Sequence, residues 1–176
     1  KTQLRELGAI VNSRTFWLVA PLIMTAQAAW FSHQALWLGP WLGDVAQKTP
    51  RAAADSLLIG ATGMVIGFIT FGVIADHLRN KGVRTNTVAA IGTGAFIIVQ
   101  MLITLPIGIA AEVLCFGFGF FGSAISLFYA DLTQRFPLEL TGRVTTTAAL
   151  LAFLGGFALN VATGLILDHW PNSLGY

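Results

Sequence analysis

Two amides and a tryptophan recur on one face of the first long apolar segment. Gln27, Trp30 and Gln34 follow the spacing of an α-helix, and Trp37 and Trp41 continue the same stripe. Polar side chains in the middle of a membrane are costly, so they usually face a cavity or a partner helix. Amides and aromatic rings together can hydrogen-bond to a small organic solute and stack on it. We therefore predict that Gln27, Trp30 and Gln34 contact a substrate.

Each of these residues also has a simpler interpretation. Gln27 could join two helices by a hydrogen bond, because amides do so in membranes. Trp37 and Trp41 are better explained as residues at the membrane–water interface, where tryptophan is enriched. The prediction of substrate contact therefore depends on Trp30 and the two glutamines.

Two titratable residues lie within apolar segments. His33 could exchange protons near neutral pH, although a hydrogen-bonded buried imidazole explains it better. Glu112 lies near one end of its segment and could carry a proton, or its carboxylate could be satisfied at the membrane interface. We favour the second alternative, and any proton coupling within this chain would use Glu112 or His33.

Three more polar residues lie in the later apolar segments. Ser123 and Ser126 fall on roughly one side of a helix, with Tyr129 one turn beyond Ser126. We predict that both serines contact the substrate. Asn160 stands four residues from both Gly156 and Gly164, and we expect it to make an interhelical hydrogen bond, with a place in the substrate cavity as the second alternative.

The composition indicates a membrane protein. Of the 176 residues, 55% are hydrophobic and 10% are charged, whereas a soluble domain carries roughly 25% charged residues. The formal charge of +2 is too small to suggest a nucleic-acid partner. The single cysteine, Cys115, excludes an internal disulfide and is best explained as a small packed residue.

Five segments are long and apolar enough to cross a membrane as helices, which requires about 20 residues. Pro106 divides the longest apolar run, because proline disfavours a helical conformation at the preceding Leu105. Glycines recur in these segments, including the pair Gly63 and Gly67, and we expect them to pack helices closely. The predicted fold is an all-α transmembrane bundle in one domain over residues 1–176, with spans at 15–41, 53–76, 86–105, 107–130 and 143–167.

Basic residues are concentrated in the links on one predicted side of the membrane. With the N-terminus in the cytoplasm, eight of the ten Lys and Arg residues are cytoplasmic, and only Lys48 and Arg51 face out. This bias is typical of cytoplasmic loops. It predicts an integral membrane protein, in a bacterial inner membrane, with a cytoplasmic N-terminus.

A small charged motif links the second and third spans. Gly72 is followed by Asp76 four residues later, and then by the basic residues Arg79, Lys81 and Arg84. Gly72 would give a neighbouring helix room to approach, and Asp76 could accept hydrogen bonds from the N-terminus of another helix. The basic side chains could bridge to carboxylates or lipid phosphates. Alternatively, they only fix the membrane topology.

This motif resembles the signature loop of the major facilitator superfamily of secondary transporters, which has a glycine, an aspartate four residues later and then clustered basic residues. Two further stretches are similar to that family. Residues 135–143, with Pro137, Gly142 and Arg143, resemble the link before its eleventh helix, and residues 34–41 resemble the end of its seventh. His77 stands where arginine is usual, and Gly82 comes about three residues later than the loop glycine often does.

The resemblance implies a role for the chain and for its charged motif. The chain would be helices seven to eleven of twelve, a partial C-terminal bundle without its last helix, with the N-terminal half of the same transporter as a partner. The seventh and tenth helices would line the central cavity. The charged motif would latch the two halves in one conformation, through Gly72, Asp76, Arg79, Lys81, Arg84 and Arg143.

The sequence indicates a transporter and no enzyme. No group of His, Cys and Asp has metal-ligand spacing, no phosphate-binding loop is present, and no serine triad is evident. We expect no cofactor and no catalytic residue. The predicted function is secondary transport of a small polar or anionic organic solute by alternating access. A membrane sensor or scaffold with the same fold is the alternative, and a polytopic membrane enzyme using His33 is a weaker one.

Overall fold

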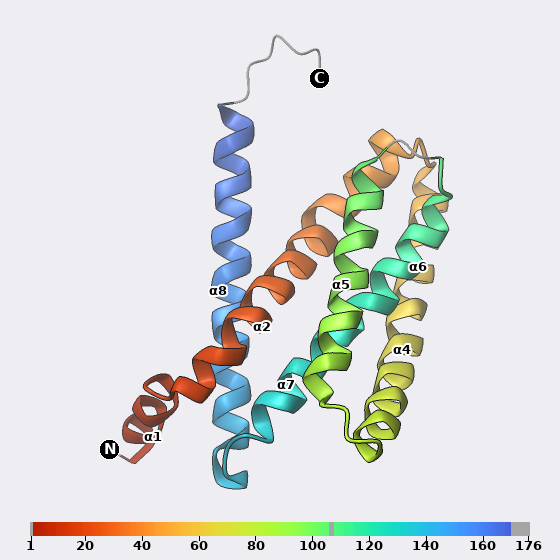
Figure 1. Cartoon of the computed structure of the whole chain (residues 1–176). Helices are drawn as coiled ribbons and strands as arrows, with labels where there is room; N and C mark the ends of the chain where they lie inside the picture. Colours follow the sequence, from red (N-terminus) through yellow and green to blue (C-terminus); the bar gives the residue numbers. More distant parts are fainter. Residues whose placement is uncertain (1, 106–107, 170–176) are drawn as a thin grey trace.

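Helices account for nearly all of the part of the chain that the structure describes. A computed structural model of the protein describes residues 2–105 and 108–169 (Figure 1). Lys1 and Pro106, which entered the topology and the helix break above, lie outside the described residues. No strand occurs in the described ranges. The all-α prediction is therefore confirmed for these residues.

Eight α-helices follow in chain order, joined by short links. They are α1 (Thr2–Val11), α2 (Arg14–Ser32), α3 (Leu38–Pro40), α4 (Pro50–Asn80), α5 (Thr85–Thr104), α6 (Ala111–Gly122), α7 (Ser126–Thr133) and α8 (Thr141–Asp168). Two π-helical segments, His33–Trp37 and Trp41–Val45, join α2 to α3 and extend α3. A 3₁₀ turn, Ser123–Ile125, joins α6 to α7, and another, Leu138–Leu140, precedes α8.

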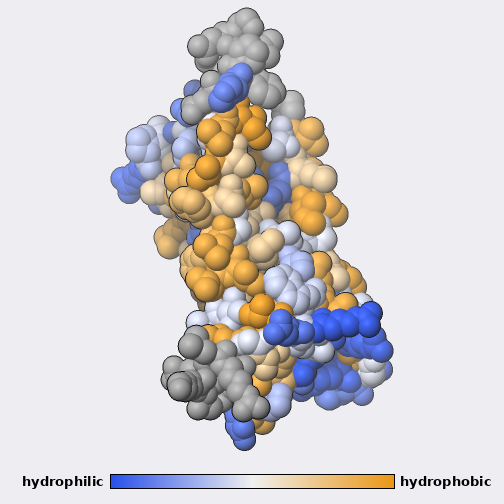
Figure 2. All heavy atoms as spheres, turned by 90° about the vertical axis from the view of Figure 1, so that its left-hand side faces the viewer, coloured by the Kyte–Doolittle hydropathy of each residue, from blue (hydrophilic) through white to orange (hydrophobic). Residues whose placement is uncertain are grey.

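Five helical units are long and apolar enough to cross a membrane. They are Arg14–Val45, Pro50–Asn80, Thr85–Thr104, Ala111–Thr133 and Leu138–Leu167. This confirms the number and the order of the predicted spans. Most of the large apolar side chains of α8 are exposed, and Figure 2 shows apolar surface along much of this face, with hydrophilic side chains towards one end.

The boundaries of the first two spans differ from the prediction. The first was expected to end at residue 41, but π-helical hydrogen bonding carries the helix past Pro40, which has no N–H to donate. The link between the first two spans was expected at residues 43–52 but is shorter, at residues 46–49. α4 begins early because the Thr49 hydroxyl caps it by accepting from Ala52 N at 3.3 Å. Pro50 suits the first turn of a helix, where its missing N–H costs no hydrogen bond.

The charged motif is helical for most of its length, which corrects its description as a link. α4 continues to Asn80, so Gly72, Asp76 and Arg79 lie on its last turns. The chain then reverses at Gly82, whose φ of 84° suits glycine. Gly82 N donates to Arg79 O and Val83 N to Leu78 O, which closes the helix with a Schellman motif.

The later spans also shift. α5 ends at Thr104, and Leu105 is extended, as expected for a residue before proline. The span predicted at 107–130 begins at Ala111 and continues to Thr133. The last span was predicted from residue 143 but begins at Leu138, because the 3₁₀ turn Leu138–Leu140 leads directly into α8 at Thr141.

The helices pack in two groups that meet along α2 and α7. α4 packs on α6, and α5 covers α6 and α7, whereas α8 packs on α2. In Figure 1, α2 crosses obliquely between the two groups, with its C-terminal extension close to the upper end of α5. Aromatic and aliphatic side chains of α2, α5, α6 and α7 form the core between them.

Candidate functional site

Glycine contacts between α4 and α6 form one wall of the candidate site. A Cβ on Gly63 would lie 2.5 Å from Phe116 O, and one on Gly67 would come too close to Phe120 O. A Cβ on Gly119 of α6 would come too close to Gly60 O. The two backbones are therefore in direct contact, as expected where small residues face each other in a membrane.

Trp30 fills the space between α2 and this pair of helices. Its ring is stacked on Phe118, with centroids 6.4 Å apart and planes 11° apart. Gly122 makes room for the indole, because a Cβ there would lie 2.6 Å from Trp30 Nε1. Trp30 Nε1 is buried without a hydrogen-bond partner among the described residues.

Two adjoining hollows lie on either side of Trp30 and Met64. The first has a volume of about 160 Å³ and is bordered by α2, α4 and the α6–α7 junction. The second has a volume of about 180 Å³ and lies between α2, α4 and α6. We call the two together the Trp30 groove. Its polar and aromatic lining residues are Gln27, Trp30, Gln34, Phe68, Phe118, Ser123, Ser126 and Tyr129.

The groove lies near the middle of three membrane-spanning units. Trp30 stands near the midpoint of Arg14–Val45, Met64 near that of Pro50–Asn80, and Gly122 near that of Ala111–Thr133. Two of these units change helix type here, to a π segment after Ser32 and to a 3₁₀ turn at Ser123. Such interruptions often mark functional sites in helices, and transporters use interrupted helices at the bilayer midplane.

The groove offers neutral hydrogen-bonding groups. The side-chain amides of Gln27 and Gln34 make no hydrogen bond to a described residue. Ser123 Oγ donates to Phe120 O at 2.6 Å and Ser126 Oγ donates to Ser123 O at 2.7 Å, so each hydroxyl oxygen keeps acceptor capacity. No charged side chain belongs to the described lining. The groove can therefore hydrogen-bond a small solute and stack on it.

Five of the six predicted substrate contacts meet in this groove, and Asn160 does not. Asn160 Oδ1 accepts a hydrogen bond of 2.5 Å from the buried Ser32 Oγ, which joins α8 to α2. This agrees with the interhelical role expected first for Asn160. Gly155, which would place a Cβ 2.9 Å from Met24 Cγ, shows how closely these two helices pack.

The single stripe predicted for α2 is divided by the π segment. Gln27, Trp30 and Gln34 line the Trp30 groove, but Trp37 and Trp41 line a cavity towards Ile103 and Thr104 of α5. The wider turns of His33–Trp37 rotate the residues that follow, so the spacing of 3.6 residues per turn no longer holds.

Met64, Phe68 and Phe118 also line the groove and were not predicted from the sequence. Met64 lies within the stretch of glycines at 60–67, whose spacing identified a packed helix face but gave no sign of a cavity. Phe118 is one of 13 phenylalanines and carries no distinguishing signal.

The two candidates for proton coupling lie outside the groove. His33 Nδ1 lies 3.0 Å from Ala29 O, so this half-buried imidazole is hydrogen-bonded to its own helix. Glu112 Oε1 accepts a hydrogen bond of 2.5 Å from Lys48 Nζ, which ties the start of α6 to the link before α4. This ion pair could not be predicted from the sequence, because its two residues are 64 positions apart in the chain.

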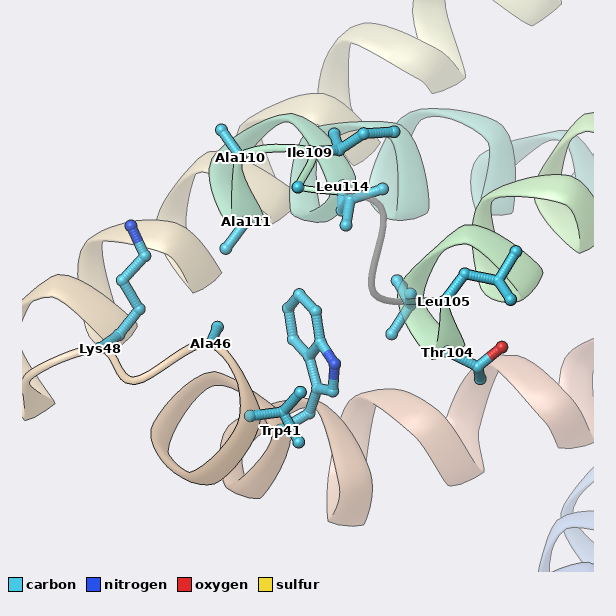
Figure 3. Close-up of a pocket in the computed structure, with 12 residues that line it drawn as sticks. Trp41, Ala46, Lys48, Thr104, Leu105, Ile109, Ala110, Ala111 and Leu114 are labelled. Carbon is cyan, nitrogen blue, oxygen red and sulfur yellow. The ribbon is translucent and has the colours of Figure 1, made fainter.

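A larger cavity of about 580 Å³ lies near this ion pair, at the end of the molecule where α4 begins (Figure 3). The indole of Trp41 stands in its middle, between Lys48 and Ala46 on one side and Thr104 and Leu105 on the other (Figure 3). Trp41 Nε1 is buried without a described partner.

The residues of the predicted latch lie at the opposite end. Asp76 Oδ1 pairs with Arg79 at 3.1 Å, and both side chains are more than half exposed. Lys81 and Arg84 are exposed, and a Cβ on Gly72 would meet no described atom within 4 Å. Arg143 lies in the first turn of α8, and Figure 1 places the start of α8 at the same end but on the other side of α7. The latch residues therefore form one cluster on α4 and its turn, with Arg143 apart.

Over residues 2–105 and 108–169 the structure is all-helical, and five of its helical units are long and apolar enough to cross a membrane. No family model, curated protein or solved structure matches the chain.

Proposed function

We propose that this chain is most of the C-terminal half of a secondary transporter of the major facilitator type. It moves a small polar or anionic organic solute across the membrane by alternating access. The observation that carries the proposal is the Trp30 groove, where two amides and an indole of the first span meet two serines of the fourth span near the middle of both spans. Neither amide has a hydrogen-bond partner among the described residues.

The distribution of basic residues supports the proposed orientation. α1, the α4–α5 turn and the α7–α8 link lie at one end of the molecule, and the link that carries Lys48 lies at the other (Figure 1). The first end carries the larger set of Lys and Arg residues in the printed sequence. By the positive-inside rule, that end is cytoplasmic in a bacterial inner membrane.

The latch is part of the same proposal. Asp76 and Arg79 are exposed on the last turns of α4, where their polar groups are available to another helix. In the proposed transporter that helix belongs to the N-terminal half. The Lys48 pair favours a structural role for Glu112 over proton coupling, because it already occupies one carboxylate oxygen.

Uptake by the complete transporter in proteoliposomes tests the proposal. The panel comprises radiolabelled hexoses, polyols, amino acids, monocarboxylates and dicarboxylates. Gln34→Ala removes one unpaired amide from the groove, and we expect it to raise the half-saturation concentration for the transported solute roughly two- to tenfold, the value of one hydrogen bond. Gln27→Ala should act in the same direction.

Gln134→Ala is the control, because Gln134 is an exposed amide directly after α7 and lies outside the Trp30 groove. Its uptake should equal that of the unchanged protein. Unchanged uptake in both Gln27→Ala and Gln34→Ala would refute the assigned site. Solute binding without uptake of any panel member would instead support a sensor or scaffold, and conversion of a solute to product would support an enzyme.

A further inference from the structure

A second set of cavities lies between α2 and α5, apart from the Trp30 groove. The lower one has a volume of about 360 Å³ and is lined by Leu22, Ala26 and Ala29 of α2 and by Gly94, Ile97 and Gln100 of α5, among others. The upper one has a volume of about 340 Å³ and is bordered by Trp37, Trp41 and Asp44 and by Ile103 of α5. We call the two together the α2–α5 furrow.

The upper part of the furrow carries a carboxylate that has no partner. The Asp44 side chain makes no hydrogen bond or ion pair with a described residue, and only its backbone oxygen accepts a bond, from Gln47 Nε2. His33 lines the same cavity, with Nδ1 directed to Ala29 O. Lys48, the nearest basic residue along the chain, is engaged by Glu112. The upper furrow therefore presents the exposed carboxylate of Asp44, which no cation of the described residues compensates.

The same cavity is walled by two indole rings. Trp37 and Trp41 are partly buried and line it together with Asp44. The face of an indole attracts ammonium groups, and the attraction adds to that of a carboxylate. Tryptophan is also enriched at the level of lipid headgroups. A carboxylate beside two indole faces therefore favours binding of an organic ammonium group.

The lower part of the furrow is shaped for a hydrocarbon chain. Its lining is mostly apolar, and a Cβ on Gly94 would meet no described atom within 4 Å. From the level of Trp41 to that of Ala29 the helix descends about 18 Å. Half of the hydrocarbon core of a bilayer is about 15 Å, so one acyl chain covers the distance from the interface to the middle of the membrane.

We propose that the α2–α5 furrow binds a phospholipid with an ammonium headgroup, of the phosphatidylethanolamine type. The ammonium lies against Asp44, Trp37 and Trp41, and one acyl chain follows α2 and α5 past Gly94. A soluble amine would use only the upper part, whereas this lipid occupies both parts. The furrow is distinct from the Trp30 groove, because Leu38, in the upper cavity, is the one lining residue that the two have in common.

Photocrosslinking in proteoliposomes tests this proposal. The probes are phosphatidylethanolamine and phosphatidylglycerol that carry the same diazirine-labelled acyl chain, and labelled peptides are mapped by mass spectrometry. We expect phosphatidylethanolamine to label peptides of α2 or α5 in preference to phosphatidylglycerol. Asp44→Asn should lower this labelling roughly two- to fivefold, the contribution of one partly exposed ion pair.

Matched variants separate the site from general effects. Asp55→Asn removes an exposed aspartate near the same end, on α4, and should leave the labelling unchanged. Gly94→Leu fills the lower furrow and should lower the labelling, whereas Gly164→Leu, on α8 with equal space for a Cβ, should not. Thermal unfolding of each variant confirms that it is folded.

Two results would overturn the proposal. Equal labelling by both lipids, unaffected by Asp44→Asn, would show a nonspecific layer of lipid around the helices. Labelling that choline chloride displaces, and that Gly94→Leu leaves unchanged, would show a site for soluble cations that does not use the acyl chain.

Discussion

Gly119 of α6 lies directly against Gly60 of α4, so that a Cβ on Gly119 would clash with Gly60 O and would lie 3.0 Å from Met64 N. The clashing atoms belong to the backbone and cannot rotate away. This contact holds α4 and α6 close enough for Met64 and Phe118 to border the Trp30 groove together. The geometry of the groove therefore depends on two residues that have no side chains.

We predict that Gly119→Ala separates α4 from α6. The variant should lose about 1–3 kcal/mol of unfolding free energy, the range for overpacking in a tight core. Unfolding of the purified protein in detergent, followed by circular dichroism, measures the loss. Gly164→Ala is the control, because its Cβ would meet no described atom within 4 Å. Equal stability of the two variants would contradict the α4–α6 contact.

The Ser32–Asn160 hydrogen bond should couple α2 to α8. In a double-mutant cycle of Ser32→Ala and Asn160→Ala, we expect a coupling energy of about 0.6–1.7 kcal/mol, as measured for interhelical hydrogen bonds in membranes. Thr163→Ala paired with Ser32→Ala serves as the control, because Thr163 Oγ1 donates to Leu159 O of its own helix. A coupling energy near zero for Ser32 and Asn160 would show that this bond does not hold α8 on α2.

We expect Asp76→Asn to lower the rate of transport while leaving the stability of the protein nearly unchanged. Asp76 and Arg79 are exposed neighbours on one helix, so breaking their pair should change the unfolding free energy by less than about 0.5 kcal/mol. As a latch residue in the complete transporter, Asp76 should instead control the conformational step, so the maximal uptake rate should fall with little change in half-saturation. Asp55→Asn, at the other end of α4, should change neither the unfolding free energy nor the maximal uptake rate. A normal uptake rate in Asp76→Asn would refute the latch role of Asp76.

The proposed orientation places Asn80 in the cytoplasm and Ala54 outside. Both positions are exposed, at opposite ends of α4. We expect a membrane-impermeant maleimide to label Ala54→Cys in intact cells, and Asn80→Cys only after permeabilisation. The experiment uses a Cys115→Ala background, although native Cys115 is itself buried. Labelling of both positions in intact cells would rule out a single crossing by α4.

The number of spans and the types of residue available to a site could be predicted from the sequence. Backbone groups in a membrane must be hydrogen-bonded within a helix, so length and apolarity suffice to locate a span. The extended conformation of Leu105 could also be predicted from the sequence, because the proline at position 106 restricts only the residue directly before it.

The position of each polar residue relative to the others was decided by tertiary structure. Periodicity placed Trp37 and Trp41 with Gln34, but the π segment turned them towards α5. Asn160 makes the interhelical hydrogen bond that was expected first for it, but the spacing did not identify Ser32 as its partner. Lys48 likewise pairs with Glu112 from a distant segment. These outcomes depend on how closely helices approach and how they cross, and a spacing pattern within one helix does not contain that information.

The sequence by itself thus determined five apolar helices, a basic end and a set of amides, serines and indoles without formal charge. Only the tertiary structure determined that Gln27, Trp30, Gln34, Ser123 and Ser126 meet in one groove. It also determined that Asp44 lies beside two indoles with no partner among the described residues. The physical reason is that membrane insertion depends on the composition of single segments, whereas a binding site depends on contacts between segments.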